Sequence, residues 1–303
     1  MGIRDFLDSR FGQYIYNILR RSANFSIAYN LSNTIADSLA GVHSSPLVQT
    51  IRLNQWVIRG ERDLSPDEAN TIVKAVLRHA GQCFVDLHRS LQNPQRIIDL
   101  ITGNPQIQFL IEAGKKNNQG LFLAITHQSN FDLALFALGI RGVNAQVLTY
   151  GQPTVWYKAQ NKVRFQSGVE ITPVSEMALL KAMKRLKQGG LVITGIDRPV
   201  GYEKQTLTFF NHPALLPIGH IRMALAANVP IIVGTVQLQS DGLYHILISD
   251  PIPMRRYSDL AENIQRNGEL VLRVVENYIR QAPEQWLMFQ PVWPDLQHVR
   301  PSI

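Results

Sequence analysis

Residues 120–140 read GLFLAITHQSNFDLALFALGI. A short apolar run at 121–126 leads into a polar turn, and a second apolar run at 133–138 is compatible with a helix. An apolar run of four to eight residues is typical of a buried strand. Because a strand, a polar turn and a helix form the repeating unit of α/β folds, this stretch predicts such a fold for the part of the chain that begins near residue 116.

Downstream of this stretch, short apolar runs continue to alternate with helical patterns. We expect strands at 145–150, 169–172, 190–196, 230–236 and 243–248. We expect helices near 154–165, 177–187, 219–228 and 260–280. The alternation predicts an α/β fold with a central mixed or parallel sheet flanked by helices.

Upstream, from about residue 3 to 115, the apolar spacing is helical instead. Ser65, Pro66 and Glu68 have the pattern of a helix start, with Ser65 as N-cap and Glu68 completing a capping box. We therefore divide the 303 residues into an N-terminal helical region at 1–115 and an α/β core at 116–303, both within one globular unit.

The segment 3–21 carries an apolar stripe next to two arginines. This pattern suits a helix that lies in lipid headgroups, but it is equally the pattern of a helix packed on a protein core, so both interpretations stay open. The stripe and the basic pair are Phe6, Phe11, Tyr14, Ile15, Ile18, Leu19, Arg20 and Arg21.

The formal net charge is +7, which favours anionic partners such as nucleic acid, anionic lipid or phosphate-bearing molecules. No apolar run approaches the roughly 20 residues that span a bilayer, and the first residues lack the pattern of a signal peptide. We expect a protein at the cytoplasmic face of the cell membrane, bound peripherally. The single cysteine, Cys83, is expected to be a buried thiol rather than a nucleophile.

His127 and Asp132 are the most informative polar residues of the chain. If 127–132 were all helical, the two side chains would point about 140° apart. If the helix begins at Ser129 or Asn130, both good N-caps, His127 lies in the preceding loop and can fold back towards Asp132. An imidazole held by a carboxylate is suited to take a proton from an alcohol. The alternative is that His127 only satisfies a hydrogen bond in a loop.

Other chemistries lack their sequence signatures. The chain has no G-x-S-x-G nucleophile elbow, no G-x-x-x-x-G-K-[ST] phosphate loop and no G-x-G-x-x-G dinucleotide fingerprint. It also has neither H-E-x-x-H nor paired cysteines, so no metal site is predicted. No recognisable nucleic-acid-binding module accompanies the positive charge, which makes a nucleic-acid binder the weakest interpretation.

The spacing His127-x4-Asp132 is similar to the first block of the lysophospholipid acyltransferase superfamily. Over roughly residues 20–293 the chain resembles one branch of it, which contains the bacterial lipid A biosynthesis (lauroyl/myristoyl) acyltransferases and the phosphatidylinositol mannoside acyltransferases. The segments that carry the resemblance are 49–54, 65–89, 158–168, 195–199, 209–224 and the closing Ala-Pro-Glu-Gln-Trp-Leu at 282–287.

The resemblance implies transfer of a fatty acyl group from acyl-CoA or acyl carrier protein, as co-substrate, to a hydroxyl of a membrane glycolipid or phospholipid. No bound cofactor or metal and no covalent acyl-enzyme are implied. The expected partners are the thioester donor, the lipid acceptor and an anionic membrane surface. His127 would be the general base, oriented by Asp132, with Asp197 from the loop 195–199 as a second candidate for that role.

Three further residues are assigned to substrate or phosphate binding: Arg164, Asn130 and Arg222. Arg164 would hold a phosphate or stabilise the developing oxyanion. The alternative is that Arg164 belongs to a solvated basic face with Lys158 and Lys162, and that Arg222 only braces a helix.

Two departures from the lipid A enzymes affect the expected acceptor. Those enzymes usually have Glu where this chain has Asp132, and an N-terminal transmembrane anchor that this sequence does not show, so the mannoside-type or other glycolipid and phospholipid enzymes are favoured. A His/Asp-dependent thioesterase or lipid hydrolase, or a non-catalytic lipid-binding paralogue, is the alternative function. Acceptor, chain length, donor and oligomeric state stay open.

Overall fold

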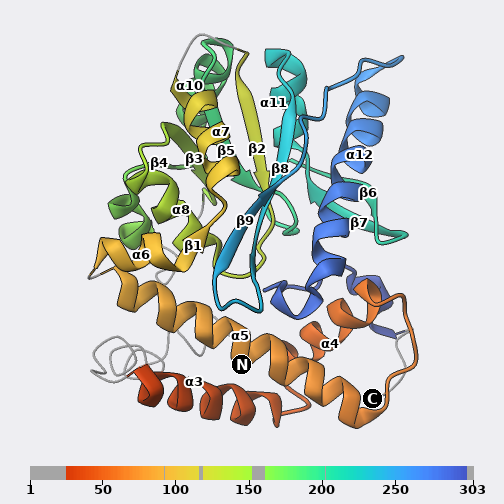
Figure 1. Cartoon of the computed structure of the whole chain (residues 1–303). Coiled ribbons are helices and arrows are strands. Elements are labelled where there is room, and N and C mark those ends of the chain that lie inside the picture. Colours follow the sequence, from red (N-terminus) through yellow and green to blue (C-terminus); the bar gives the residue numbers. More distant parts are fainter. Residues whose placement is uncertain (1–24, 92, 116–118, 152–160, 202, 299–303) are drawn as a thin grey trace.

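The computed structural model describes residues 25–91, 93–115, 119–151, 161–201 and 203–298 (Figure 1). The helix expected at 3–21 lies outside these residues, as does most of the helix expected at 154–165. Among the described residues, no helix combines the length and the apolar character needed to cross a bilayer.

The centre of the molecule is a seven-stranded sheet in the order β1-β9-β8-β2-β5-β3-β4. Strands β8, β2, β5, β3 and β4 run parallel to one another, whereas β9 is antiparallel to β8 and parallel to β1. This arrangement confirms the predicted α/β fold with a mixed, mainly parallel sheet. The strands are β1 Ile101–Thr102, β2 Leu121–Ile125, β3 Ala145–Thr149, β4 Glu170–Pro173, β5 Leu191–Gly195, β8 Ile231–Leu238 and β9 Tyr244–Ile248.

Alternate residues of each strand face two different cores, as the two-residue period of a strand requires. In β2, Phe122 and Ala124 pack on one face of the sheet against α10, α11 and α12. Leu121 and Leu123 pack on the other face against α5, α7 and α8. The covering helices are α7 Asn104–Lys115, α8 Phe131–Ile140, α10 Glu176–Lys187, α11 Gly219–Ala227 and α12 Leu260–Gln281.

Helices predominate in the described part of the N-terminal region, as predicted. They are α3 Phe25–Ala40, α4 Pro46–Ile58, α5 Pro66–Ser90 and α6 Pro94–Leu100, followed by the two-residue β1 and by α7. Helix α5 begins with the expected capping box between Ser65 and Glu68. Figure 1 shows α5 crossing below the sheet, with α3 alongside it. From α4, the Asn54 amide donates to the backbone oxygens of Met288 and Gln290, so the helical region holds the 286–292 segment.

The sequence pattern did not predict the antiparallel hairpin of β6 Lys204–Phe209 and β7 His212–Pro217, which lies outside the main sheet. Its two turn residues, Phe210 and Asn211, have positive φ angles of 50° and 63°. Asn is a usual residue in such a turn, but Phe is not. The turn therefore lacks the sequence pattern from which a hairpin is normally predicted.

Candidate active site

Two neighbouring parallel strands, β2 and β5, place the central pair of the site. Ile125 pairs with Gly195 at their carboxyl ends, and each chain then leaves the sheet into a loop. His127 lies two residues beyond Ile125, and Asp197 lies two residues beyond Gly195. The two side chains therefore meet at the carboxyl edge of the sheet, where open α/β folds bind their ligands.

The Asp197 carboxylate is fully buried, with 0% of the residue exposed, and it accepts three hydrogen bonds from N–H groups. His127 Nδ1 donates to Oδ1 at 2.5 Å, while the His127 backbone N–H and the Trp286 indole N–H donate to Oδ2 at 2.9 and 2.8 Å. Burial by itself opposes ionisation, but the imidazole, the backbone amide and the indole outweigh it and hold the pKa of Asp197 below its usual range. Asp197 is therefore a fixed negative charge.

This contact assigns the protons of His127. A carboxylate only accepts hydrogen bonds, so Nδ1 carries the hydrogen and Nε2 carries the lone pair. Only 13% of the His127 side chain is exposed. Burial, followed by the charge of Arg198, lowers the pKa of His127 even though Asp197 acts in the opposite direction. The imidazole is therefore neutral near pH 7 and has a basic nitrogen available.

The ring of His127 is held between Gly195 and Phe131. A Cβ added at Gly195 would lie 2.5 Å from Cε1 of His127, so only glycine leaves room for the imidazole. The Phe131 ring meets the imidazole edge-on, with ring centroids 5.2 Å apart. Among the described residues, no group hydrogen bonds to His127 Nε2. The lone pair on this nitrogen is therefore not engaged within the described part of the protein.

The segment that follows α12 pairs with the histidine loop as a short antiparallel ladder. The Ser129 N–H donates to the Gln285 carbonyl at 2.7 Å, and the Leu287 N–H donates to the His127 carbonyl at 2.9 Å. Gln128 and Trp286 form the bridge between these bonds. The closing segment therefore holds the backbone of His127 and, through Trp286, its carboxylate partner.

A buried chain of hydrogen bonds between hydroxyl and amide side chains fixes the same loop to β8. Thr126 donates to the hydroxyl of Thr235 at 2.7 Å, and Thr235 donates to Oε1 of Gln128 at 2.8 Å. The amide nitrogen of Gln128 donates to the Ala282 carbonyl at 2.9 Å. The loop is thus restrained on both sides, which fixes the position of the His127 backbone.

Ser129 has a positive φ of 50°, a strained backbone conformation for a residue that is not glycine. Its hydroxyl lies 3.0 Å from Nε2 of His79, which is buried on α5. Burial lowers the pKa of His79 to about 4, so this imidazole is neutral. Sequence reasoning missed His79 because nothing in a helical apolar pattern distinguishes a histidine that faces a loop.

The predicted contact between Asp132 and His127 is not formed, and Asp197 takes its place. Helix α8 begins at Phe131 with Asn130 as its N-cap, so Asp132 lies in the first turn and pairs with Arg164. The guanidinium Nε and Nη2 donate to the two carboxylate oxygens at 2.6 and 3.0 Å. The first helical turn therefore directs the Asp132 carboxylate to Arg164.

The three residues assigned to substrate or phosphate binding all have partners within the protein. Asn130 accepts from the Leu133 N–H and donates to the Cys83 carbonyl, both buried. Arg164 is buried against Asp132, and Arg222 on α11 forms an exposed ion pair with Glu203. Their binding roles stay predictions. Trp286, Gly195 and Arg198 lay inside segments noted in the sequence, but nothing in the spacing indicated that they contact or influence His127.

We expect Arg164→Met to lower the free energy of unfolding by about 3–5 kcal/mol, because it leaves the Asp132 carboxylate without its buried partner. Urea unfolding followed by circular dichroism measures the change. The matched control is Arg266→Met, which breaks the exposed pair with Glu262 and should cost less than about 0.5 kcal/mol. Equal losses in the two variants would contradict this account.

An apolar pocket lies beside the histidine loop, between α8 and strands β2, β8 and β9. Its cavity volume is small, about 40 Å³, and the cavity continues into empty space that is open to solvent. Among the described residues that line it, the polar ones are Thr126 and Thr235, whose hydroxyls bond to each other. The apolar lining residues are Leu110, Leu123, Ile125, Phe131, Ala134, Leu135, Leu138, Ile193, Gly234, Val236, Ile246 and Ile248. The lining is of the apolar kind that hydrocarbon groups prefer.

Cys83 is buried, and burial raises the pKa of its thiol far above the usual range. In the described part of the chain, no group of three or more His, Cys, Asp or Glu side chains is arranged to hold a metal ion.

Comparison with protein families places the sequence in a known group. The model of the bacterial lipid A biosynthesis acyltransferases matches residues 13–294, nearly the whole length. No curated protein matches the chain. The family match agrees with the branch that the sequence motifs resembled. This protein therefore belongs to the bacterial lipid A biosynthesis acyltransferase family.

Proposed function

We propose that the protein transfers a fatty acyl group from acyl-CoA or acyl carrier protein to a hydroxyl of a membrane glycolipid or phospholipid. The observation that carries the proposal is the fixed pair of His127 and Asp197, which leaves Nε2 of a neutral imidazole as the available base. The apolar pocket at Thr126 and Phe131, directly beside this pair, supports a fatty acyl chain as the second component.

In the first half of the reaction, the acceptor hydroxyl gives its proton to His127 Nε2 while its oxygen attacks the thioester carbonyl carbon. Asp197 stabilises the imidazolium that forms, because its negative charge lies at Nδ1. In the second half, the tetrahedral intermediate collapses, the carbon–sulfur bond breaks and the imidazolium returns the proton to the leaving thiolate. The products are an ester and a free thiol, and no group on the protein is acylated.

The lining of the pocket suggests how acyl chain length is selected. Phe131, Ala134 and Leu138 lie on successive turns of α8, so they line the pocket at increasing distance from His127. Larger side chains at Ala134 should therefore shorten the space for the chain. In the series Ala134→Val, Ala134→Leu and Ala134→Phe, we expect kcat/KM to fall progressively for palmitoyl donors and much less for lauroyl donors.

Competition between the two donors, followed by mass spectrometry, gives this ratio directly. Circular dichroism should accompany it, because overpacking costs about 1–3 kcal/mol of stability. If every variant lowers the rates with both donors equally, the acyl chain does not occupy this pocket.

The pH dependence of kcat/KM should reflect the shifted pKa of His127. Activity requires the neutral imidazole, so it stays constant above the pKa of His127 and falls as pH drops below it. Since burial and Arg198 lower the pKa, the fall should begin below the ordinary histidine value of 6.5. In Arg198→Gln one positive charge is lost, the imidazolium is less destabilised, and the fall should move to higher pH. A pH profile unchanged by Arg198→Gln would contradict this assignment.

The function is tested with purified protein, palmitoyl-CoA or palmitoyl-acyl carrier protein, and a panel of glycolipid and lysophospholipid acceptors. Mass spectrometry should find one acceptor that gains the acyl chain, together with the released thiol in equal amount. If free fatty acid forms at the same rate with and without acceptors, the protein is a hydrolase and the proposal fails.

A further inference from the structure

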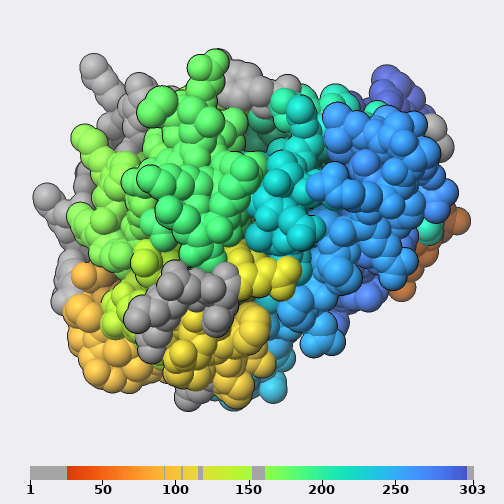
Figure 2. All heavy atoms as spheres, turned by 90° about the horizontal axis from the view of Figure 1, so that it is seen from above, coloured from red at the N-terminus to blue at the C-terminus, as the bar shows by residue number. Residues whose placement is uncertain are grey.

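The outer face of α10 carries large apolar side chains that no described element covers. Met177 is 74% exposed and Leu180 is 64% exposed, whereas Ala178, Ala182 and Leu186 on the opposite side are buried against the sheet. A helix on the surface of a protein normally presents polar residues outward. Figure 2 shows the green segment that contains α10 at the surface of the molecule, in the face seen from above.

Two lysines share this face. At 100° per residue, Met177, Leu180, Lys184 and Lys187 fall within an arc of roughly 80° around the helix axis. Lys184 and Lys187 are both exposed, and no ion pair joins either of them to a described carboxylate. The "α10 face", defined by these four residues, therefore combines two large apolar side chains with two uncompensated positive charges.

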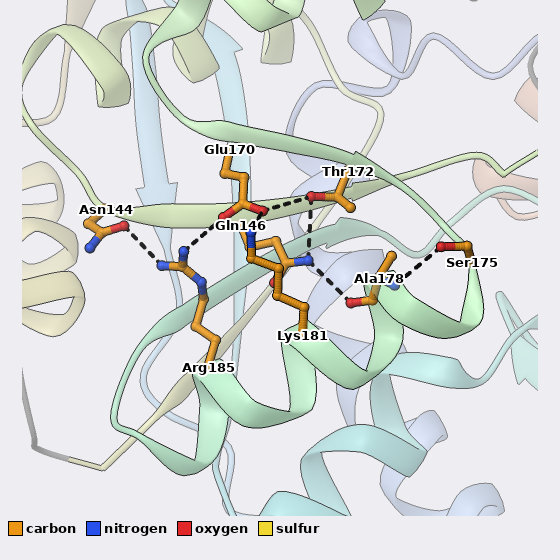
Figure 3. Close-up of polar contacts among 8 residues, drawn as sticks. All are labelled: Asn144, Gln146, Glu170, Thr172, Ser175, Ala178, Lys181 and Arg185. Carbon is orange, nitrogen blue, oxygen red and sulfur yellow. Dashed lines mark hydrogen bonds and ion pairs between the residues drawn. The ribbon is translucent and has the colours of Figure 1, made fainter.

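The other basic residues of α10 hold the helix in this orientation (Figure 3). Lys181 and Arg185 reach from the helix to opposite oxygens of Glu170 on β4, at 2.5 and 3.0 Å. Between them, the Gln146 amide on β3 donates to the Ala178 carbonyl at 3.2 Å. These bonds prevent the helix from turning Met177 and Leu180 towards the core, so the α10 face is presented rigidly.

The first half of the α10 face lies near the edge of the sheet that carries the active site, whereas Lys184 and Lys187 lie towards the opposite edge, where β5 begins. Helix α10 begins just after the carboxyl end of β4, and β4 is parallel to β2, which His127 follows. In the order β2-β5-β3-β4 these strands are three spacings apart, roughly 14 Å. Met177 and Leu180, in the first half of α10, are thus on the same side of the molecule as the candidate base.

We propose that the α10 face docks on the surface of an anionic phospholipid bilayer. The inference rests on the proposed function, because a lipid acceptor has to reach His127 from a membrane. Helices that lie in lipid headgroups insert apolar side chains while lysines bind the anionic headgroups. A second copy of the protein is disfavoured as the partner of this face, because a symmetric contact would place the lysines of the two copies close together and they would repel each other. An acidic protein surface would attract the two lysines, but its charged side chains would leave Met177 and Leu180 without an apolar environment.

Leu260 shows that exposed leucine alone does not make such a face. It is 55% exposed at the start of α12 and has two acidic neighbours, Asp259 and Glu262, whereas Met177 has one, Glu176, and is followed on the same face by two lysines. Leu260→Ser is therefore the matched control for the apolar part. The matched control for the charges is Lys74→Gln with Lys204→Gln, which removes two exposed lysines elsewhere on the surface.

The test is flotation of the full-length protein with vesicles of phosphatidylglycerol and phosphatidylcholine, compared with vesicles of phosphatidylcholine alone. Lys184→Gln with Lys187→Gln should weaken binding to the anionic vesicles about 30-fold, since each lysine near the surface contributes about a fivefold factor. Met177→Ser with Leu180→Ser should weaken it about tenfold or more. Added salt should reproduce the lysine effect only. Both control variants should bind within about threefold of wild type, because neither alters the α10 face.

Transfer to an acceptor dispersed in detergent separates this inference from the proposed function. Both α10 variants should retain wild-type rates there, because none of the four side chains touches the site. If they bind vesicles as wild type does, or if the controls lose as much, the docking face is wrong while the function stands. If they lose binding only to acyl carrier protein, the occupant is that protein and the proposal is overturned. If wild type transfers no acyl chain but the variants still lose vesicle binding, only the function fails.

Discussion

Acyl transfer by His127→Ala is expected to be about 10⁴-fold slower than by wild type, with little change in KM. The variant removes the group placed to accept the proton of the attacking hydroxyl, and general-base catalysis contributes up to about that factor. His127 accepts the proton in the transition state and contributes little to substrate binding. Its removal should therefore lower kcat rather than raise KM. Single-turnover transfer of a labelled acyl chain measures it.

The control for this variant is His245→Ala. His245 is a half-buried histidine on β9 that pairs with Asp241, and its removal should leave kcat unchanged. If His127→Ala transfers acyl chains at a rate within about tenfold of wild type, far short of the loss expected for a general base, His127 is not the base.

Asp197→Asn should lower kcat nearly as far, by about 10³- to 10⁴-fold, because it changes the tautomer of His127. Two N–H donors, from the His127 backbone and the Trp286 indole, converge on Oδ2, so the carbonyl oxygen of the substituted amide takes that position. The amide NH₂ then faces Nδ1, which has to give up its hydrogen and accept. The hydrogen moves to Nε2, and the base is lost although the fold is retained.

The comparison with Asp132→Asn makes this prediction specific to one carboxylate. Asp132 bonds to Arg164 and not to the imidazole, so its amide variant should keep the tautomer and most of kcat. Nitrogen NMR of the labelled imidazole observes the tautomer directly in both variants. If Asp132→Asn is the slower of the two enzymes, the assignment of Asp197 as the partner of His127 is wrong.

Strands β2, β5 and β8 could be predicted because each is a short, mostly apolar run that is buried on both faces. The start of α8 could also be predicted, because Asn130 is a good N-cap residue and caps that helix in the structure. The partner of His127 was harder to identify. The choice between Asp132 and Asp197 depends on β2 pairing with β5, a contact across 70 positions of the chain that no local pattern contains.

Two other parts of the site depend on equally distant contacts. Gly195 is needed only because the His127 ring lies against its backbone, and a strand pattern gives no sign of this. Trp286 could be recognised as part of a conspicuous closing segment, but its indole reaches Asp197 only after α12 has packed on the sheet. Local patterns thus predicted the framework, whereas the polar contacts of the site followed from tertiary packing.

The ladder between the histidine loop and residues 285–287 also has a consequence for the order of events on the ribosome. The loop emerges first, and the segment that pairs with it follows roughly 160 residues later, a delay on the order of ten seconds or more at ordinary synthesis rates. During that interval β2 and β5 have both been synthesised, yet the carbonyl of His127 still lacks the Leu287 N–H and the second oxygen of Asp197 still lacks the Trp286 indole. We therefore expect nascent chains that stop before residue 286 to contain most of the sheet and no catalytic competence, which ties the onset of activity to the last stage of translation.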